Sequence, residues 1–406
     1  MDLDCCARAK PNPVQPQLGR GLIIKQTTAK PWLSEVTKHG FGLLCSREAQ
    51  SVQPQLGRGL IIKQTTAKPW LYQAKNMSTL PSLSTANPAF TPVALTPETP
   101  PLTCARQLIL ERVQEMVKFE EGTRKGEDLE ALHDMRVWSR RLREAFEIFI
   151  FCFPEKVYNK LYDRVRQVTK TLGKAREADV AVEFFTQLYN ASQDMIARFA
   201  LEDMLSRLVE TQTHERSRMQ SKLDRKVKPG ALPEELTLAF EKLAAQPASR
   251  QRGPRTALRL ARTLLLQRLR TLFTLRQAIT GEDDVNGLHN LRIGVKKLRY
   301  ALETLSFAAG TEVETNLKFF KKLQTALGEI HDRDVFIAEV KARYDALQQR
   351  AYSATLLQGY ETIFQHLLQA RRGFYEEYMK LFGEAKLVEW QKRVVPPLAR
   401  RAHVRQ

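Results

Sequence analysis

The sequence predicts an all-α protein, and three observations support that class. From Pro101 onward, apolar residues recur at three- and four-residue spacing, which is typical of helices with one buried face. Leu, Ala, Arg, Glu, Lys and Gln, which favour helices, dominate this region, and the alternating pattern of strands is missing from it. Hydrophobic residues make up 43% of the 406-residue chain, enough for a sizeable core.

The periodic segments predict a series of helices joined by short breaks. In the first half, we expect helices over residues 102–121, 127–152, 155–172, 175–190, 193–226 and 234–245. A polar linker containing Pro247 and Pro254 follows. In the second half, we expect helices over residues 255–280, 284–308, 312–328, 332–351, 353–382 and 384–403.

The first hundred residues differ from the rest. Val14–Leu33 is repeated letter for letter as Val52–Leu71, which indicates a recent duplication of DNA rather than a structural repeat. Met77 then opens a Ser/Thr/Pro-rich stretch of the kind that forms flexible tethers. We therefore expect residues 1–100 to be a disordered or mispredicted amino-terminal extension, with Met77 as a plausible start.

The chain is strongly basic. Its 64 Lys and Arg residues against 45 Asp and Glu residues give a formal charge of +19, which favours acidic partners without choosing among them. The five cysteines form neither a CxxC motif nor a disulfide framework, so we expect a reducing cytoplasm. No apolar run approaches the roughly 18 residues that span a bilayer. The sequence does not indicate an oligomeric state.

The second half of the helical region echoes the first. LHDMRVWSRRLREAFEIF begins at Leu132 and LHNLRIGVKKLRYALETL at Leu288, an offset of 156 residues. LGKAREADV begins at Leu172 and LGEIHDRDV at Leu327, an offset of 155 residues. Matching order and offset indicate an internal duplication, and we expect one repeat over 101–250 and the other over 251–406.

The first motif of each repeat predicts a helix with a cationic ridge. On a helix, His133, Arg136, Arg140 and Arg143 fall within about 80° of arc, and Met135, Leu142 and Phe146 fall on the opposite side. In the second repeat, His289, Arg292, Lys296 and Arg299 take the same angular places, and Arg141 and Lys297 flank the two ridges.

Such ridges could bind phosphate groups, although two interpretations without a ligand stay open. Arginine presents a planar fork to phosphate oxygens, lysine adds a point charge, and the proton affinity of histidine should rise near an anion. A run of charged residues usually forms only a solvated helix face, and a histidine can serve only as a packing residue in the core. Because like charges at these spacings repel one another, their repetition at matching angles favours a binding site.

These motifs resemble the CHAD domain, a family named for conserved histidines in an α-helical domain. The resemblance covers residues 101–406 and implies two tandem four-helix-bundle-like repeats with pseudo-twofold symmetry around a basic cavity that binds inorganic polyphosphate. The polyphosphate-binding positions that it implies are His133, Arg136, Arg140, Arg141, Arg143, His289, Arg292, Lys296, Lys297 and Arg299.

The LG motifs depart slightly from the family pattern. Glu177 stands where the family usually carries Asp, and the second motif carries His331. We expect Asp179 and Asp334 to stabilise helix starts or to orient neighbouring arginines, not to catalyse. Lys170, Lys174, Arg176, Lys321 and Lys322 either extend the basic surface or form a solvated face.

Other chemistries are weighed against polyphosphate binding. The histidines lack metal-ligand spacing and stand beside arginines that would repel a cation, so we expect no metal and no cofactor. A phosphate-metabolising enzyme would need paired carboxylates or an activated nucleophile, and we expect no catalytic residue. Nucleic-acid binding is less expected, because aromatic residues do not interleave with the basic ones and Trp138 projects toward the core. A helical scaffold would leave the double basic motif unexplained.

Overall fold

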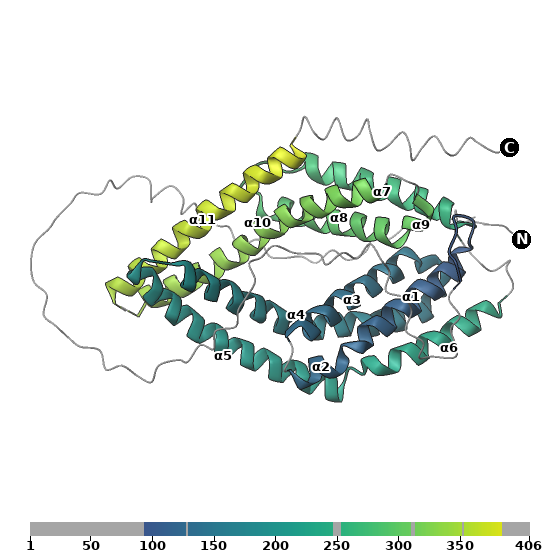
Figure 1. The fold of residues 1–406 in the computed structure, drawn as a ribbon, viewed down its shortest axis with the longest axis horizontal. Coiled ribbons are helices and arrows are strands. Elements are labelled where there is room, and N and C mark those ends of the chain that lie inside the picture. Colours follow the sequence, from purple (N-terminus) through teal and green to yellow (C-terminus); the bar gives the residue numbers. More distant parts are fainter. Residues whose placement is uncertain (1–92, 127–128, 247–252, 310–312, 351–352, 384–406) are drawn as a thin grey trace, which may run out of the picture. The chain divides into compact units, whose positions relative to one another are not determined.

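The computed structural model describes residues 93–126, 129–246, 253–309, 313–350 and 353–383. Every regular element in these ranges is a helix, which confirms the predicted all-α class (Figure 1). Most of the predicted amino-terminal extension, up to residue 92, and the helix predicted over 384–403 lie outside the described residues. Within the described ranges, none of the helices is both long and apolar enough to cross a bilayer.

The described helices form two consecutive sets along the chain, one before residue 247 and one after residue 252. The first set comprises α1 (Pro101–Lys118), α2 (Glu120–Lys125), α3 (Leu129–Ile148), η2 (Ile150–Cys152), α4 (Glu155–Ala191), α5 (Met195–Arg225), η3 (Pro229–Ala231) and α6 (Leu232–Ala244). The second comprises α7 (Ala257–Gln277), α8 (Val285–Thr304), α9 (Ser306–Ala309), α10 (Val313–Gln348) and α11 (Ala354–Phe382).

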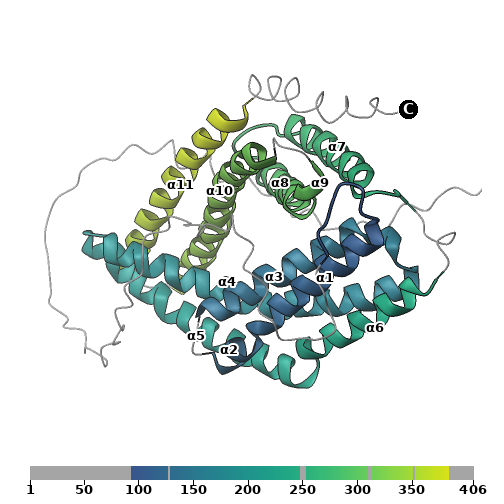
Figure 2. The same cartoon turned by 45° about the vertical axis from the view of Figure 1, so that its right-hand side comes forward.

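Both sets have the same order of neighbours. In the first, α1 packs on α3, α3 on α4 and α4 on α5; in the second, α7 packs on α8, α8 on α10 and α10 on α11. Helices α4 and α5 run side by side, as do α10 and α11 (Figures 1 and 2). The predicted pseudo-twofold symmetry and the boundary between 101–250 and 251–406 stay predictions.

Local capping explains where several helices begin. Asp194 accepts hydrogen bonds from the backbone N–H groups of Ile196 and Ala197 at the start of α5. Thr256 caps α7, and Asp284 caps α8 by accepting from the backbone of Gly287. These side chains satisfy N–H groups that lack a partner in the first turn of a helix. Asp284, as the N-cap of α8, therefore fixes the start of the helix that carries the second ridge.

Two predicted breaks are wrong. We expected helices to end at residue 172 and at residue 328, but α4 runs unbroken for 37 residues and α10 for 36. Gly173 and Gly328 are tolerated inside these helices, because a glycine costs only about 1 kcal/mol relative to alanine and the flanking Leu172 and Leu327 are buried. Packing of the apolar face outweighs the low helix propensity of glycine.

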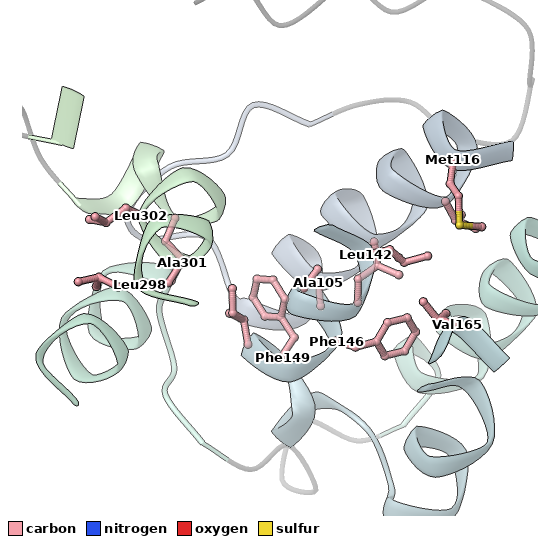
Figure 3. Packing of buried hydrophobic residues seen from close by; sticks show 14 of the residues in the cluster. Ala105, Met116, Leu142, Phe146, Phe149, Val165, Leu298, Ala301 and Leu302 are labelled. Carbon is pink, nitrogen blue, oxygen red and sulfur yellow. The ribbon is translucent and has the colours of Figure 1, made fainter. Parts of the chain in front are cut away.

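The first core cluster joins the two helix sets. Phe146 of α3 and Phe149, the residue after α3, lie in the same cluster as Leu298, Ala301 and Leu302 of α8 (Figure 3). Apolar residues of α1, α4, α6, α7 and α10 complete this cluster. A second cluster is formed by α4, α5, α10 and α11. The apolar sides of α3 and α8 are thus anchored in one shared core, which leaves their polar sides to form the site.

Candidate functional site

The apolar side of each ridge helix is buried as the helical projection predicts. Met135, Leu142 and Phe146 of α3 are fully buried, and so are Leu291 and Leu298 at the corresponding places of α8. Because α3 contacts α8 directly, burying these faces fixes both ridge helices against one another. The geometry of the predicted ridges is therefore set by the core.

Four cations from the two ridges lie close enough to interact. We call Arg136 and Arg140 of α3 with Arg292 and Lys296 of α8 the cationic cluster. Burial, followed by repulsion from Arg140, lowers the pKa of Arg136 to about 10, and Arg292 contributes to the same shift. Burial, followed by repulsion from Arg292, Arg140 and Arg136, lowers the pKa of Lys296 to about 7. The predicted rows thus act on one another across the α3–α8 contact.

Few acids neutralise the cationic cluster. Glu177 of α4 accepts a hydrogen bond from Arg136 at 3.1 Å. Asp332 of α10 raises the pKa of Arg292 more than Arg140 lowers it, but it only partly offsets the repulsion that Lys296 feels. In the part of the chain that the structure describes, no carboxylate forms an ion pair with Arg140, Arg292 or Lys296. Half-buried cations without counter-charges are costly to keep, so the cluster has surplus capacity for an anion.

The other four predicted cations are tied to acids between the ridges. Arg141 of α3 lies 3.9 Å from Glu303 of α8, and Lys297 of α8 lies 3.1 Å from Glu147 of α3. These two ion pairs are counterparts in the 156-residue repeat, so each ridge helix holds the other in the same way.

Arg143 and Arg299 are engaged locally. Arg143 lies 4.0 Å from Glu147 and donates to the Tyr162 hydroxyl at 3.2 Å. Arg299 pairs with Glu303 and donates to Gln324 Oε1 at 2.8 Å. The eight predicted arginines and lysines therefore divide into the four of the cationic cluster and four that pair with Glu147 or Glu303. A binding role for the second four stays a prediction.

The motif histidines stand beside further basic groups. Burial, followed by the nearby charge of Arg176 on α4, lowers the pKa of His133. The ring of His289 stacks on that of His331 with centroids 4.8 Å apart, and burial, followed by His331 and Arg292, lowers the pKa of His289. Without an anion, both histidines are therefore poorer proton acceptors than usual.

The described residues hold no group of three or more His, Cys, Asp or Glu side chains that could bind a metal ion. The side chains of the cationic cluster themselves supply hydrogen-bond donors and positive charge.

Comparison with known proteins agrees with this architecture. The family model of the CHAD domain matches residues 107–341. This chain belongs to the CHAD domain family.

Two solved structures share the CHAD fold. The CHAD domain from the plant Ricinus communis matches with 20% sequence identity and a TM-score of 0.52, covering 77% of this chain and 95% of that one. PptA from Streptomyces chartreusis matches with 14% identity and a TM-score of 0.54, covering 70% of this chain and 99% of that one. At these identities the likeness shows the fold alone. The comparison with curated proteins returned no match.

The LG-motif aspartates of this CHAD domain do not start helices, contrary to one of the roles we expected. Asp179 lies inside α4 and Asp334 inside α10. Asp179 Oδ1 accepts hydrogen bonds from Arg216 Nε at 3.0 Å and Nη2 at 2.9 Å, and Asp334 Oδ1 accepts from Arg371 Nε at 2.5 Å. Their other expected role, as orienters of arginines, is the one that the structure supports.

Arg216 and Arg371 were missed by sequence reasoning. Arg216 donates to the carbonyl of Gly126 at 3.2 Å, and Arg371 donates to the carbonyl of Glu282 at 2.8 Å. Both carbonyls precede a ridge helix in the chain, so the two arginines fasten the segments that lead into α3 and α8. The available signal was the offset: Arg216 and Arg371 are 155 residues apart, like Asp179 and Asp334.

Proposed function

We propose that this CHAD domain binds inorganic polyphosphate without catalysing a reaction on it, in the cytoplasm and in association with polyphosphate granules. The observation that carries the proposal is the cationic cluster. These four side chains, Arg136, Arg140, Arg292 and Lys296, come from two helices. Burial, followed by repulsion from the three arginines, lowers the pKa of Lys296 to about 7.

The chemistry of polyphosphate fits such a cluster. Each phosphate of the chain carries negative charge and oxygen acceptors, so a flexible thread can satisfy several cations in succession. Guanidinium groups bind phosphate oxygens in pairs, and a lysine adds an unspecific point charge. A bound polyanion relieves the mutual repulsion within the cluster, because it places opposite charge between the two ridges.

Nucleic acid offers similar charge but needs partners that the cluster lacks. Base stacking on exposed aromatic rings stabilises single-stranded nucleic acid in proteins. Trp138, the aromatic residue nearest the first ridge in sequence, packs against the core, and the Arg141 guanidinium covers its ring at 4.9 Å. The site therefore favours a polyanion that has no bases, with nucleic acid as the competing ligand in the test below.

Binding to immobilised polyphosphate tests the proposal. Changing Arg136, Arg140, Arg292 and Lys296 together to alanine should weaken binding at least about 100-fold, because each charge-assisted hydrogen bond contributes about 1.5–3 kcal/mol. Helicity should persist, since three of the four side chains form no ion pair in the described part of the chain.

A matched variant controls for net charge. Changing Lys160, Arg225, Arg270 and Lys380 to alanine removes the same positive charge from exposed positions and should leave binding largely intact. Equal loss in both variants would reduce the site to a diffuse basic surface. Stronger binding of single-stranded DNA than of polyphosphate at equal charge would contradict the proposal and would indicate that nucleic acid is the ligand.

A further inference from the structure

The two halves of the cationic site differ in the kind of basic residue that they contain. The α3–α4 half contributes arginines, Arg136, Arg140 and Arg176, which stay charged at physiological pH. At the matching places, the α8–α10 half has Arg292, Lys296 and His331, offset from them by 156, 156 and 155 residues. A lysine therefore stands in that half where the α3–α4 half has an arginine, and a buried lysine, unlike an arginine, can lose its charge.

Lys296 faces cations from its own helix and from α3. Arg292 lies one turn away on α8, Arg140 and Arg136 come from α3, and the opposing charge is Asp332 of α10. Burial, followed by these arginines, lowers the pKa of Lys296 to about 7. Free Lys296 therefore loses its proton at a much lower pH than an exposed lysine.

The remaining neighbours of α8 do not offset this repulsion. On α7, Arg268 pairs with Glu144 and donates to the carbonyl of Lys297, and Arg276 donates to the carbonyl of Phe382. Helix α9 carries no titratable residue. Nothing on these two helices supplies a carboxylate to Lys296.

A stacked pair of imidazole rings also lies in this half of the site, which has few carboxylates. His289 and His331 lie 4.8 Å apart with ring planes inclined by 28°, and His331 Nδ1 lies 3.2 Å from Asp332 Oδ1. Two positively charged rings in this arrangement repel one another, and Arg292 and Lys296 act on His289 in the same direction. Protonation of His289 is therefore favoured by further negative charge nearby.

We propose that the α8–α10 half of the site takes up protons when a phosphate chain binds, with Lys296 as the principal acceptor and His289 as a secondary one. This inference rests on the proposed function and adds its regulation. A bound phosphate chain favours the ammonium and imidazolium forms. Affinity is then highest in acidic to neutral conditions and falls as the pH rises.

Linkage sets the size of the effect. Above the pKa of free Lys296, uptake of one proton on binding makes Kd rise about tenfold for each pH unit. The rise continues until the pH reaches the higher pKa of Lys296 in the complex. Below pH 7, Lys296 is already charged and the dependence on pH is smaller.

Calorimetric titration of the whole protein with long-chain polyphosphate tests this inference. Titrations in buffers of different ionisation enthalpy give the number of protons taken up, and long chains minimise the contribution of their titratable terminal groups. Wild-type protein should take up close to one proton above pH 7. The Lys296→Arg variant should take up far fewer and should bind more tightly than wild type there, because arginine stays charged.

The Lys380→Arg variant, changed at an exposed lysine of α11, serves as the matched control and should keep the wild-type proton uptake. Binding of polyphosphate without proton uptake, or equal uptake by wild type and Lys296→Arg, overturns the inference and leaves the proposed function standing. Failure of the wild-type protein to bind polyphosphate at any pH overturns both.

Discussion

At the scale of single residues, the structure shows which of the predicted basic residues have partners on other helices, a distinction that the sequence could not provide. The spacing of Arg136, Arg140 and Arg143 on one helix predicted a ridge from geometry alone. Their different fates depend on partners from other elements: Glu177 of α4 reaches Arg136, and Tyr162 of α4 reaches Arg143. A single sequence carries no signal for such contacts, so free and tied cations could not be told apart.

The buried ion pairs of the LG motifs support a prediction about stability. The Asp334→Ala substitution should lower the free energy of unfolding by about 3 kcal/mol, because it removes the nearer of the two carboxylates that pair with Arg371, whose side chain is 6% exposed, and leaves only Glu282 at 3.5 Å. The Asp163→Ala substitution breaks an exposed pair with Arg166 and should cost less than about 1 kcal/mol. Urea denaturation measures both. Similar losses would show that the buried pair has no special importance.

At the scale of helices, apolar periodicity predicted the buried faces well and the boundaries less well. Leu142 and Phe146 of α3 and Leu298 of α8 are buried as their positions require. The false breaks at Gly173 and Gly328 arose because glycine was given more weight than the apolar pattern on either side of it. Helix α4 stays continuous through Leu172 and Ala175, which are both fully buried.

Glycine substitutions test this continuity. Gly173→Ala and Gly328→Ala should each raise the free energy of unfolding by about 0.5–1 kcal/mol, since a Cβ at either position meets no atom closer than 3.8 Å. Gly359→Ala should lower it instead, because its Cβ would lie 2.4 Å from the carbonyl oxygen of Ile196 on α5. Thermal denaturation of the three variants checks the order. Destabilisation by Gly173→Ala or Gly328→Ala would indicate that these glycines are required.

At the scale of the whole molecule, the duplication predicted two sets of helices but not every link between them. Arg343 of α10 donates to Asp203 of α5 at 2.8 and 2.7 Å, and the buried Tyr360 of α11 donates to the same carboxylate at 2.6 Å. The residues 155 positions away from these three are Leu188, Gln358 and Leu205, which cannot form the same network. Contacts outside the repeated motifs therefore left no sign in the sequence.

Acid should weaken this link between the sets. Although burial acts to raise it, hydrogen bonds from Arg343 and Tyr360 lower the pKa of Asp203 below its ordinary value of 3.8. A lowered pKa in the folded state stabilises the protein above pH 3.8, and this contribution is lost as the pH falls through the folded pKa. The difference in urea midpoint between wild type and Asp203→Asn should thus shrink below pH 3.8. A constant difference down to the lowest pH would contradict the assignment.

The central claim is that α3 and α8 grip one phosphate chain together, and calorimetric stoichiometry tests it most directly. Long-chain polyphosphate should bind wild-type protein in a single event, and the paired variants Arg136→Ala/Arg140→Ala and Arg292→Ala/Lys296→Ala should each lose most of the affinity, because each removes half of one shared site. Two independent binding events in the wild type, with one abolished and the other unchanged in each paired variant, would contradict the account.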